Sequence, residues 1–268
     1  MVREYTTMSF EEYFWRGVDL DGKVVLDAGT GFGVTTREIA RRMSRQKHKG
    51  KIISVDINPE AFERARKMLQ MQWWIDLLKL KTPKELLGLV EFVKADLSNM
   101  PEIKSESIGV IISTRTLADI NSSPCRLTKA ITEFYRVLKP CGQVVLSDEC
   151  PALIPTYKEE EVAVKRWQVI KALSHLIGRP HANEINPDDL EFIMRLAGFK
   201  ECRYAIFNGE KTQLRRMKHF EERAKELVSK LENLKLKDAF IDEVKRIKEM
   251  FNKQGGSFPQ RYILHAKK

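Results

Sequence analysis

Apolar runs with strand character alternate with helical segments along the chain. The apolar runs occupy residues 23–30, 51–57, 89–97, 107–117, 143–149, 201–208 and 261–268. Between them, apolar residues recur at helical spacing, as in the stripe Phe62, Ala65, Leu69 and Trp73. This alternation predicts an α/β fold, a doubly wound and mostly parallel sheet of seven strands covered by helices on both faces.

Local signals place the ends of the predicted helices. Asn58 is suited to cap the second helix, and Pro59 to its first turn. The sequence Pro140-Cys141-Gly142 is expected to break the third helix before the fifth strand, and Gly198 to stop the fourth. The four helices are expected over 34–46, 58–80, 123–138 and 187–199.

Two further helical segments interrupt the alternation. The first covers 157–178 and the second 210–254, where the apolar residues fit two helices. Neither segment is large enough for an independent domain, so we expect one domain over 1–268 with helical insertions. The apolar residues of the second insertion are Leu214, Met217, Ala224, Leu227, Leu231, Phe240, Val244, Ile247 and Phe251.

The composition is that of a globular protein with a surplus of positive charge. Hydrophobic residues make up 43% and charged residues 31% of the 268 positions, and the formal net charge is +10. This charge permits binding to a polyanion such as RNA, but Lys and Glu are interleaved as on solvated helix faces. No uncharged apolar run is long enough for a transmembrane helix, so no membrane partner is expected.

The cysteines bear on metal binding and on the cellular compartment. Cys125, Cys141, Cys150 and Cys202 form no C-x-x-C pair and have no His at metal-ligand spacing. We therefore expect no metal site and four reduced, buried thiols. The N-terminal residues carry acids and lack the apolar region of a signal peptide. Together these features predict a cytoplasmic protein.

Three glycines follow the first strand at alternate positions, in the stretch Asp27-Ala28-Gly29-Thr30-Gly31-Phe32-Gly33. No Lys follows them, which excludes a P-loop. A dinucleotide fingerprint requires a glycine where Val34 stands, and the Asp27 carboxylate would repel its pyrophosphate. The same carboxylate favours a cationic ligand.

This stretch resembles the first motif of the class I S-adenosylmethionine (SAM)-dependent methyltransferases, a buried strand that ends in D/E-x-G-x-G-x-G. SAM carries a positive amino group and a sulfonium but no phosphate, and the glycines let the backbone approach its methionine moiety. The segment 134–149, FYRVLKPCGQVVLSDE, also resembles this family, with Cys141 in place of the family's first glycine. The match covers residues 20–208 plus the last strand, which the resemblance implies is antiparallel.

The resemblance implies a cofactor and the residues that hold it. The cofactor is SAM, and S-adenosyl-L-homocysteine is its product. In this family an acidic residue at the end of the second strand binds both ribose hydroxyls, which here is Asp56, with Ile57 placed against the adenine. Asp96 follows the third strand and takes the adenine amino group, with Leu97 beside it. The implied cofactor set is Asp27, Gly29, Thr30, Gly31, Gly33, Asp56, Ile57, Asp96, Leu97 and Thr114.

No catalytic residue follows from the resemblance, because methyl transfer chiefly needs alignment of the acceptor and exclusion of water. The N/D-P-P-Y/F motif of amino-methylating enzymes is missing after the fourth strand, where the chain reads STRTLADINSSP. Cys125 follows a proline, as in cytosine-C5 enzymes, but a helix start explains Pro124. Asp119 and Glu149 are the candidates for a base. Further candidates for the acceptor pocket are Arg115, Thr116, Asp148, His175 and His181.

The sequence supports three hypotheses of function. The first is a SAM-dependent methyltransferase of a small molecule, with the N-terminal segment 1–20 and the 157–178 helix as lids over the acceptor. The second is an RNA or protein methyltransferase that docks through the basic segment 210–254. The third is a SAM-binding module without catalysis. The oligomeric state stays open.

Overall fold

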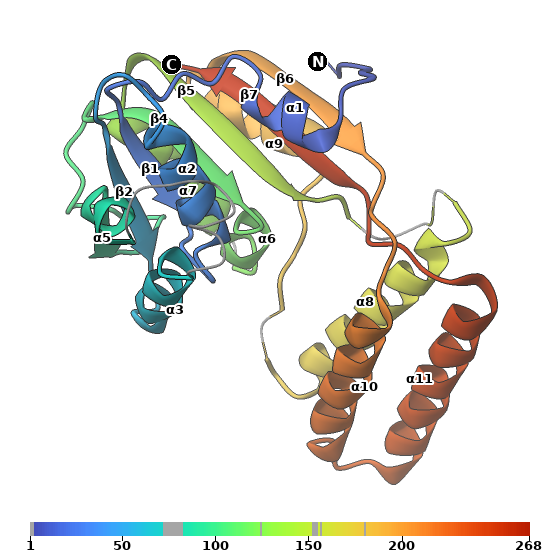
Figure 1. The fold of residues 1–268 in the computed structure, drawn as a ribbon. Coiled ribbons are helices and arrows are strands. Elements are labelled where there is room, and N and C mark those ends of the chain that lie inside the picture. Colours follow the sequence, from blue (N-terminus) through green and yellow to red (C-terminus); the bar gives the residue numbers. More distant parts are fainter. Residues whose placement is uncertain (1–2, 72–82, 124, 152–154, 156, 180) are drawn as a thin grey trace.

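A seven-stranded sheet forms the centre of the structure, a computed structural model that describes residues 3–71, 83–123, 125–151, 155, 157–179 and 181–268 (Figure 1). The strands are β1 (Val24–Ala28), β2 (Lys51–Asp56), β3 (Val90–Lys94), β4 (Ile108–Thr114), β5 (Leu138–Glu149), β6 (Lys200–Phe207) and β7 (Arg261–Lys267). Their order is β3-β2-β1-β4-β5-β7-β6. Strands β1 to β5 are parallel, and β7 is antiparallel to both β5 and β6. The predicted fold class is confirmed.

Helices cover both faces of this sheet. One layer comprises α6 (Leu117–Ile120), α7 (Arg126–Val137) and α9 (Pro187–Leu196). The other comprises α1 (Phe10–Trp15), α2 (Val34–Met43), α3 (Glu60–Leu69) and α5 (Pro83–Gly88). The first layer packs on Leu26 and Leu146, and the second on Val25 and Val145. Successive strand residues thus enter opposite cores, as the pleat of a strand requires.

Helix α3 begins at Glu60 with Pro59 as its N-cap, one residue later than the sequence predicts. The Asn58 Oδ1 atom accepts the backbone N–H of Glu60 at 3.0 Å, so Asn58 satisfies a free donor of the first turn. The first three residues of the predicted apolar stripe are buried. Trp73 and the rest of the predicted 58–80 helix beyond Met71 lie outside the described residues.

The two helical insertions pack against each other as one three-helix unit. Helix α8 (Glu160–Leu176) comes from the first insertion, and α10 (Leu214–Ser229) and α11 (Leu234–Gln254) from the second. The unit has a core of its own, which includes Leu173, Phe220 and Ile247, and it lies to one side of the sheet in Figure 1. Leu214, the first apolar residue of the second insertion, is 58% exposed because it opens α10.

Strand β5 begins earlier than the sequence predicts. Helix α7 ends at Val137 and β5 starts at Leu138, so residues 140–142 lie within the strand instead of a break before it. The pairing with β4 shifts register between Leu138 and Gln143. A bulge therefore absorbs the Pro-Cys-Gly sequence inside the strand.

The cysteines differ from the expectation of four buried thiols. Cys202 is buried and Cys150 is half-buried, but Cys125 and Cys141 are exposed. Both exposed cysteines lie at irregular backbone, one directly before α7 with φ of 63° and one in the β5 bulge with φ of 60°. Their side chains consequently leave the packed layers, and the expectation is wrong for these two.

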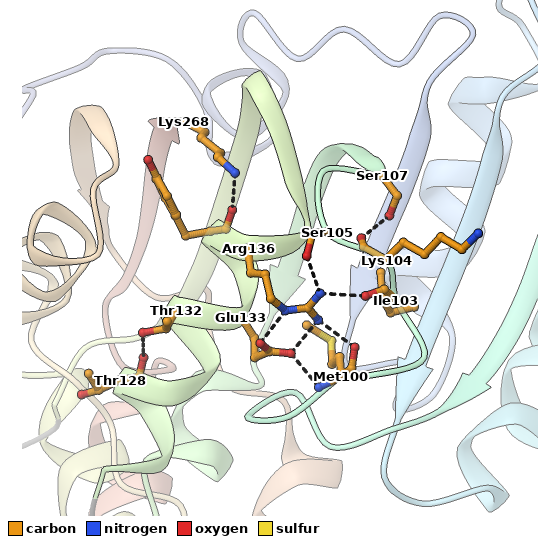
Figure 2. Close-up of polar contacts among 11 residues, drawn as sticks. Met100, Ile103, Lys104, Ser105, Ser107, Thr128, Thr132, Glu133, Arg136 and Lys268 are labelled. Atoms are coloured by element: carbon orange, nitrogen blue, oxygen red, sulfur yellow. Dashed lines mark hydrogen bonds and ion pairs between the residues drawn. The ribbon is translucent and has the colours of Figure 1, made fainter.

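Arg136, on α7, fastens the loop between β3 and β4 to that helix (Figure 2). Its guanidinium donates to the backbone oxygens of Met100 at 2.8 Å and Ile103 at 2.9 Å. It also donates to Glu133, one turn earlier on the helix, and Glu133 accepts the backbone N–H of Met100 at 2.7 Å. A planar group with five donors can serve all of these acceptors together.

Replacing Arg136 with Lys is expected to lower the free energy of unfolding by about 1–2 kcal/mol, because one ammonium cannot reach both carbonyls and Glu133. The matched control is Arg246→Lys, at an exposed ion pair with Glu243 of 3.1 Å. The control is expected to change that free energy by less than about 0.5 kcal/mol. Guanidinium denaturation followed by circular dichroism measures both variants. Equal losses of unfolding free energy in Arg136→Lys and Arg246→Lys would contradict the role given to Arg136.

Candidate cofactor and acceptor site

The glycine loop between β1 and α2 is tightly packed at two glycines and open at the third. Gly29, Gly31 and Gly33 have φ values of 98°, 51° and 77°, which favour glycine. A Cβ on Gly29 would lie 2.2 Å from Thr116 Oγ1, and one on Gly33 would lie 2.5 Å from the Cα of Ala65. A Cβ on Gly31 would meet nothing within 4 Å. The loop therefore borders open space at Gly31.

Asp56 lies at the end of β2, against the tip of this loop. Its carboxylate accepts the backbone N–H groups of Gly31 and Asn58, each at 2.9 Å. Ile57, the next residue, is 59% exposed, so an apolar surface adjoins the carboxylate. Strands β2 and β4 lie on opposite sides of β1, and the carboxyl ends of strands at such a crossover are where doubly wound sheets bind ligands.

Asp27 lies beneath the loop and is fully buried. It accepts hydrogen bonds from the hydroxyls of Thr36 and Ser54, the latter at 2.9 Å, while its Oδ1 atom has no partner among the described residues. Burial raises the pKa of Asp27 to about 6, against these two hydrogen bonds. Asp27 therefore supports the loop from below and does not line the open space in this conformation.

Ser54 is hydrogen-bonded to two residues of the predicted cofactor set, Asp27 and Thr30, but is not itself part of that set. The hydroxyls of Thr30 and Ser54 lie 2.7 Å apart, and both residues are buried. Thr114 forms a similar tie, because its hydroxyl bonds that of Thr35 at the start of α2. The serine in the apolar strand KIISVDI could have indicated this role, because a buried hydroxyl needs a hydrogen-bond partner.

Asp96 is already engaged by protein groups. Both of its oxygens accept from an Arg126 nitrogen at 2.9 Å, and the backbone N–H and hydroxyl of Ser98 also donate to it. Burial opposes ionisation, but the hydrogen bonds from Ser98 and Arg126 prevail, so the pKa of Asp96 lies below its ordinary value. Leu97 is buried in the core below. No local sequence signal marks Arg126, which is 30 positions from Asp96 in the chain.

The candidates for the acceptor pocket converge at the ends of β4 and β5. The N–H of Arg115 donates to the Ser147 oxygen at 2.8 Å, which holds the segment after β4 beside β5. The Asp148 carboxylate accepts the N–H groups of Ala118 at 3.1 Å and Glu149 at 2.8 Å, and burial raises its pKa to about 7. Thr116 immediately precedes α6.

Glu149 and Asp119, the candidates for a base, both hold a proton more readily than an exposed carboxylate. Burial raises the pKa of Glu149 despite the nearby charges of Arg115 and Arg261. Partial burial likewise raises the pKa of Asp119, against the charges of His181 and Arg223. The raised pKa makes either carboxylate a better proton acceptor than an exposed one.

The two histidines differ in their surroundings. His181 lies edge-on to Trp167 with ring centroids 5.3 Å apart, and burial lowers its pKa. The N–H of Asn183 donates to the Ala118 oxygen at 2.8 Å, which ties the His181 segment to α6. His175 is exposed on the last turn of α8. The structure therefore brings His181, but not His175, into a packed setting near Asp119.

The N-terminal segment packs along β6 and β7. The backbone oxygen of Tyr13 and the His265 Nε2 atom are 3.0 Å apart, and Tyr13 is fully buried. The N–H of Glu4 donates to the Tyr204 oxygen at 2.7 Å. Phe10 lies 4.1 Å below the guanidinium of Arg261, at the start of β7. The role of this segment as a lid stays a prediction.

Neither a metal-binding cluster nor a membrane-spanning helix is found among the described residues. No group of three or more His, Cys, Asp or Glu side chains there is arranged to hold a metal ion. Within the same ranges, the helices lack the combination of length and apolar character needed to cross a membrane.

Comparisons with known proteins agree with this architecture. A family model described as a methyltransferase domain matches residues 19–222. The ubiquinone/menaquinone biosynthesis C-methyltransferase UbiE of Rickettsia typhi is 23% identical over 197 residues, which cover 69% of this chain and 71% of that protein.

Solved structures show the same fold. A cyclopropane-fatty-acyl-phospholipid synthase-like protein from Lactobacillus casei aligns with a TM-score of 0.65 and 14% identity, over 96% of this chain and 88% of that chain. Phosphoethanolamine N-methyltransferase 2 of Haemonchus contortus, in complex with S-adenosyl-L-methionine, aligns with a TM-score of 0.51 and 16% identity, over 96% of this chain and 51% of that chain. With its glycine loop, its strand order and a family match over most of its length, this chain belongs to the methyltransferase domain family and has the class I fold.

Proposed function

We propose that this chain transfers a methyl group from SAM to a small-molecule acceptor and releases S-adenosyl-L-homocysteine. The open space at Gly31, beside the carboxylate of Asp56 and at the crossover of the sheet, carries the proposal. Gly31 tolerates close approach of a ligand, and Asp56 offers acceptor oxygens to the ribose hydroxyls. The proposal places the enzyme in the cytoplasm, because its four cysteines are free thiols.

The remaining residues of the cofactor set divide into contacts and supports. Ile57 offers an exposed apolar surface to the adenine, and Asp96 keeps acceptor capacity beyond its bonds to Arg126 and Ser98. Asp27 and Thr30 hold the loop in shape from below. Thr114 fixes the start of α2 to the end of β4. Leu97 packs beneath the adenine side of the site.

When bound, SAM supplies a methyl group that its sulfonium has already activated. The chain then has to orient the acceptor and exclude water. Either Glu149 or Asp119 takes the proton where the acceptor must lose one, since burial raises the pKa of both carboxyls. Asp148 acts as a positioning residue, because it is buried and bonds two backbone N–H groups.

The segments outside the sheet complete the site. In this proposal residues 1–268 act as one domain, the segments 1–20 and 157–178 are lids over the acceptor, and 210–254 is a helical insertion before the last strand. Docking of RNA on the last segment has less support. Acidic residues pair with its basic ones, as in Lys248–Glu221 at 3.0 Å and Lys230–Glu226. Interleaved charge of this kind forms no continuous basic face.

A labelled-methyl transfer screen tests the proposed function. The full chain is incubated with methyl-labelled SAM and with cell extract separated into small-molecule, RNA and protein fractions. We expect label only in the small-molecule fraction. Label in RNA or protein would refute the acceptor class, and no transfer to any fraction would favour a SAM-binding module without catalysis.

A further inference from the structure

Three arginines from distant parts of the chain gather around Glu149. Thr114 pairs with Ser147 across β4 and β5, and Glu149 pairs with Arg261 across β5 and β7. Arg115, directly after Thr114, and Arg261 therefore lie on either side of the end of β5. Both side chains are close enough for their charges to act on Glu149.

The third arginine, Arg166, comes from the three-helix unit. The first turn of α8 is held beside the start of β7, because the N–H of Gln260 donates to Glu160 Oε1 at 3.0 Å. The N–H of Ser257 also donates to the Glu159 oxygen at 3.0 Å. Arg166 lies further along α8, stacked over Phe220 at 5.4 Å, and its charge also acts on Glu149.

The positive charge of this cluster exceeds what the protein neutralises. Arg115 and Arg166 form no ion pair with any described residue, and the buried Nε atom of Arg166 has no hydrogen-bond partner there. Arg261 pairs with Glu210 at 3.1 Å, but the Glu210 side chain is 78% exposed. Glu149 lies among the three guanidinium groups. The Glu184 carboxylate, whose charge also acts on Glu149, already pairs with Lys171.

Burial of Arg166 and Arg261 makes their unneutralised positive charge unfavourable. It lowers the pKa of Arg166 to about 10, with the nearby Arg216 adding repulsion. It also lowers the pKa of Arg261, to which the repulsion of Arg115 contributes. Half-buried guanidinium groups that repel one another are unfavourable unless an anion joins them. Planar guanidinium donors suit the oxygens of a carboxylate or phosphate.

We propose that the methyl acceptor carries an anionic oxyacid group, a carboxylate or a phosphate, and that Arg115, Arg166 and Arg261 bind this group at the end of β5. The inference rests on the proposed function for its meaning, since it names the substrate class of that site. The cluster lies at the ends of β4 and β5 and the start of the antiparallel β7, so an acceptor anchored there sits at the same edge of the sheet as Asp56.

Calorimetric titration of the full chain with inorganic phosphate and, separately, with succinate tests the anion site. We expect saturable binding of at least one anion, weakened about 10- to 100-fold in Arg166→Gln. Arg166→Lys keeps the charge and is expected to recover part of the affinity. The matched control, Lys235→Gln, removes one exposed charge from α11 and is expected to bind as the parent does. The better-bound anion identifies the group as phosphate or carboxylate.

The outcomes separate this inference from the proposed function. Absence of saturable binding for both anions, or equal affinities in the parent and Arg166→Gln, would overturn the anion site. Titration with S-adenosyl-L-homocysteine is run in parallel, and Arg166→Gln is expected to bind it as the parent does. A parent chain that binds phosphate but not S-adenosyl-L-homocysteine would refute the proposed function and leave the anion site standing.

Discussion

Gly31→Val is expected to abolish binding of S-adenosyl-L-homocysteine. The Cβ of any residue at this position enters the open space beside Asp56, and the two methyl groups of Val fill it further. Because nothing in the protein lies within 4 Å of that Cβ, the substitution obstructs the ligand and not the packing of the loop. Isothermal titration calorimetry of the folded variant measures the loss.

Backbone strain is the competing explanation, since Gly31 has φ of 51° and Val disfavours that conformation. Gly17→Val controls for it. Gly17 has φ of 68° and open space around its Cβ position, but it lies in the turn after α1. Both variants are expected to lose about 1–2 kcal/mol of unfolding free energy, and only Gly31→Val is expected to lose binding. Equal affinities in the two variants would show that the open space is not where the ligand binds.

Asp56→Ala is expected to weaken binding of S-adenosyl-L-homocysteine about 100-fold or more. Two hydrogen bonds from ribose hydroxyls to a carboxylate are lost, and each bond to a charged group contributes about 1.5–3 kcal/mol. The backbone N–H groups of Gly31 and Asn58 also lose their acceptor, which loosens the tip of the loop. Calorimetry gives the affinity, and thermal unfolding confirms that the variant folds.

A ligand without ribose hydroxyls separates these two effects. The 2′,3′-dideoxy form of S-adenosyl-L-homocysteine is expected to bind the parent weakly. Asp56→Ala is expected to weaken its binding little further, because removing either partner of an interaction already loses that interaction. Asp21→Ala is the matched control, because Asp21 also accepts a loop N–H, that of His48 at 2.7 Å. Full additivity of the two changes would contradict direct contact between Asp56 and the ribose.

The sequence alone predicts the features of the fold that depend on local pattern. Apolar runs identify each strand of the sheet, and the glycine loop and Asp56 follow from spacing within one βαβ segment. Strand ends are less accurate. The start of β5 differs because a bulge can hold a Pro-Cys-Gly sequence inside a strand, and local signals cannot distinguish it from a turn.

Features built from distant residues do not follow from pattern. Asp96 and Arg126 are 30 positions apart, and their ion pair depends on how α7 packs against the sheet. The two insertions form one core because α8 meets α10 and α11 in space. The charge of Arg166 acts on Glu149 because the first turn of α8 is held beside the start of β7. The arginine cluster therefore becomes visible only in the folded chain.

The position of β7 in the sheet has a consequence for synthesis of the protein on the ribosome. Strand β7 follows every other strand in the chain, yet it lies between β5 and β6. The parallel strands β1 to β5 can assemble as they emerge, whereas β6 and its hydrophobic residues wait for β7. The whole of α10 and α11 is translated during that interval. Conditions that slow elongation after β6 should therefore expose an unpaired strand edge and favour aggregation of the nascent chain.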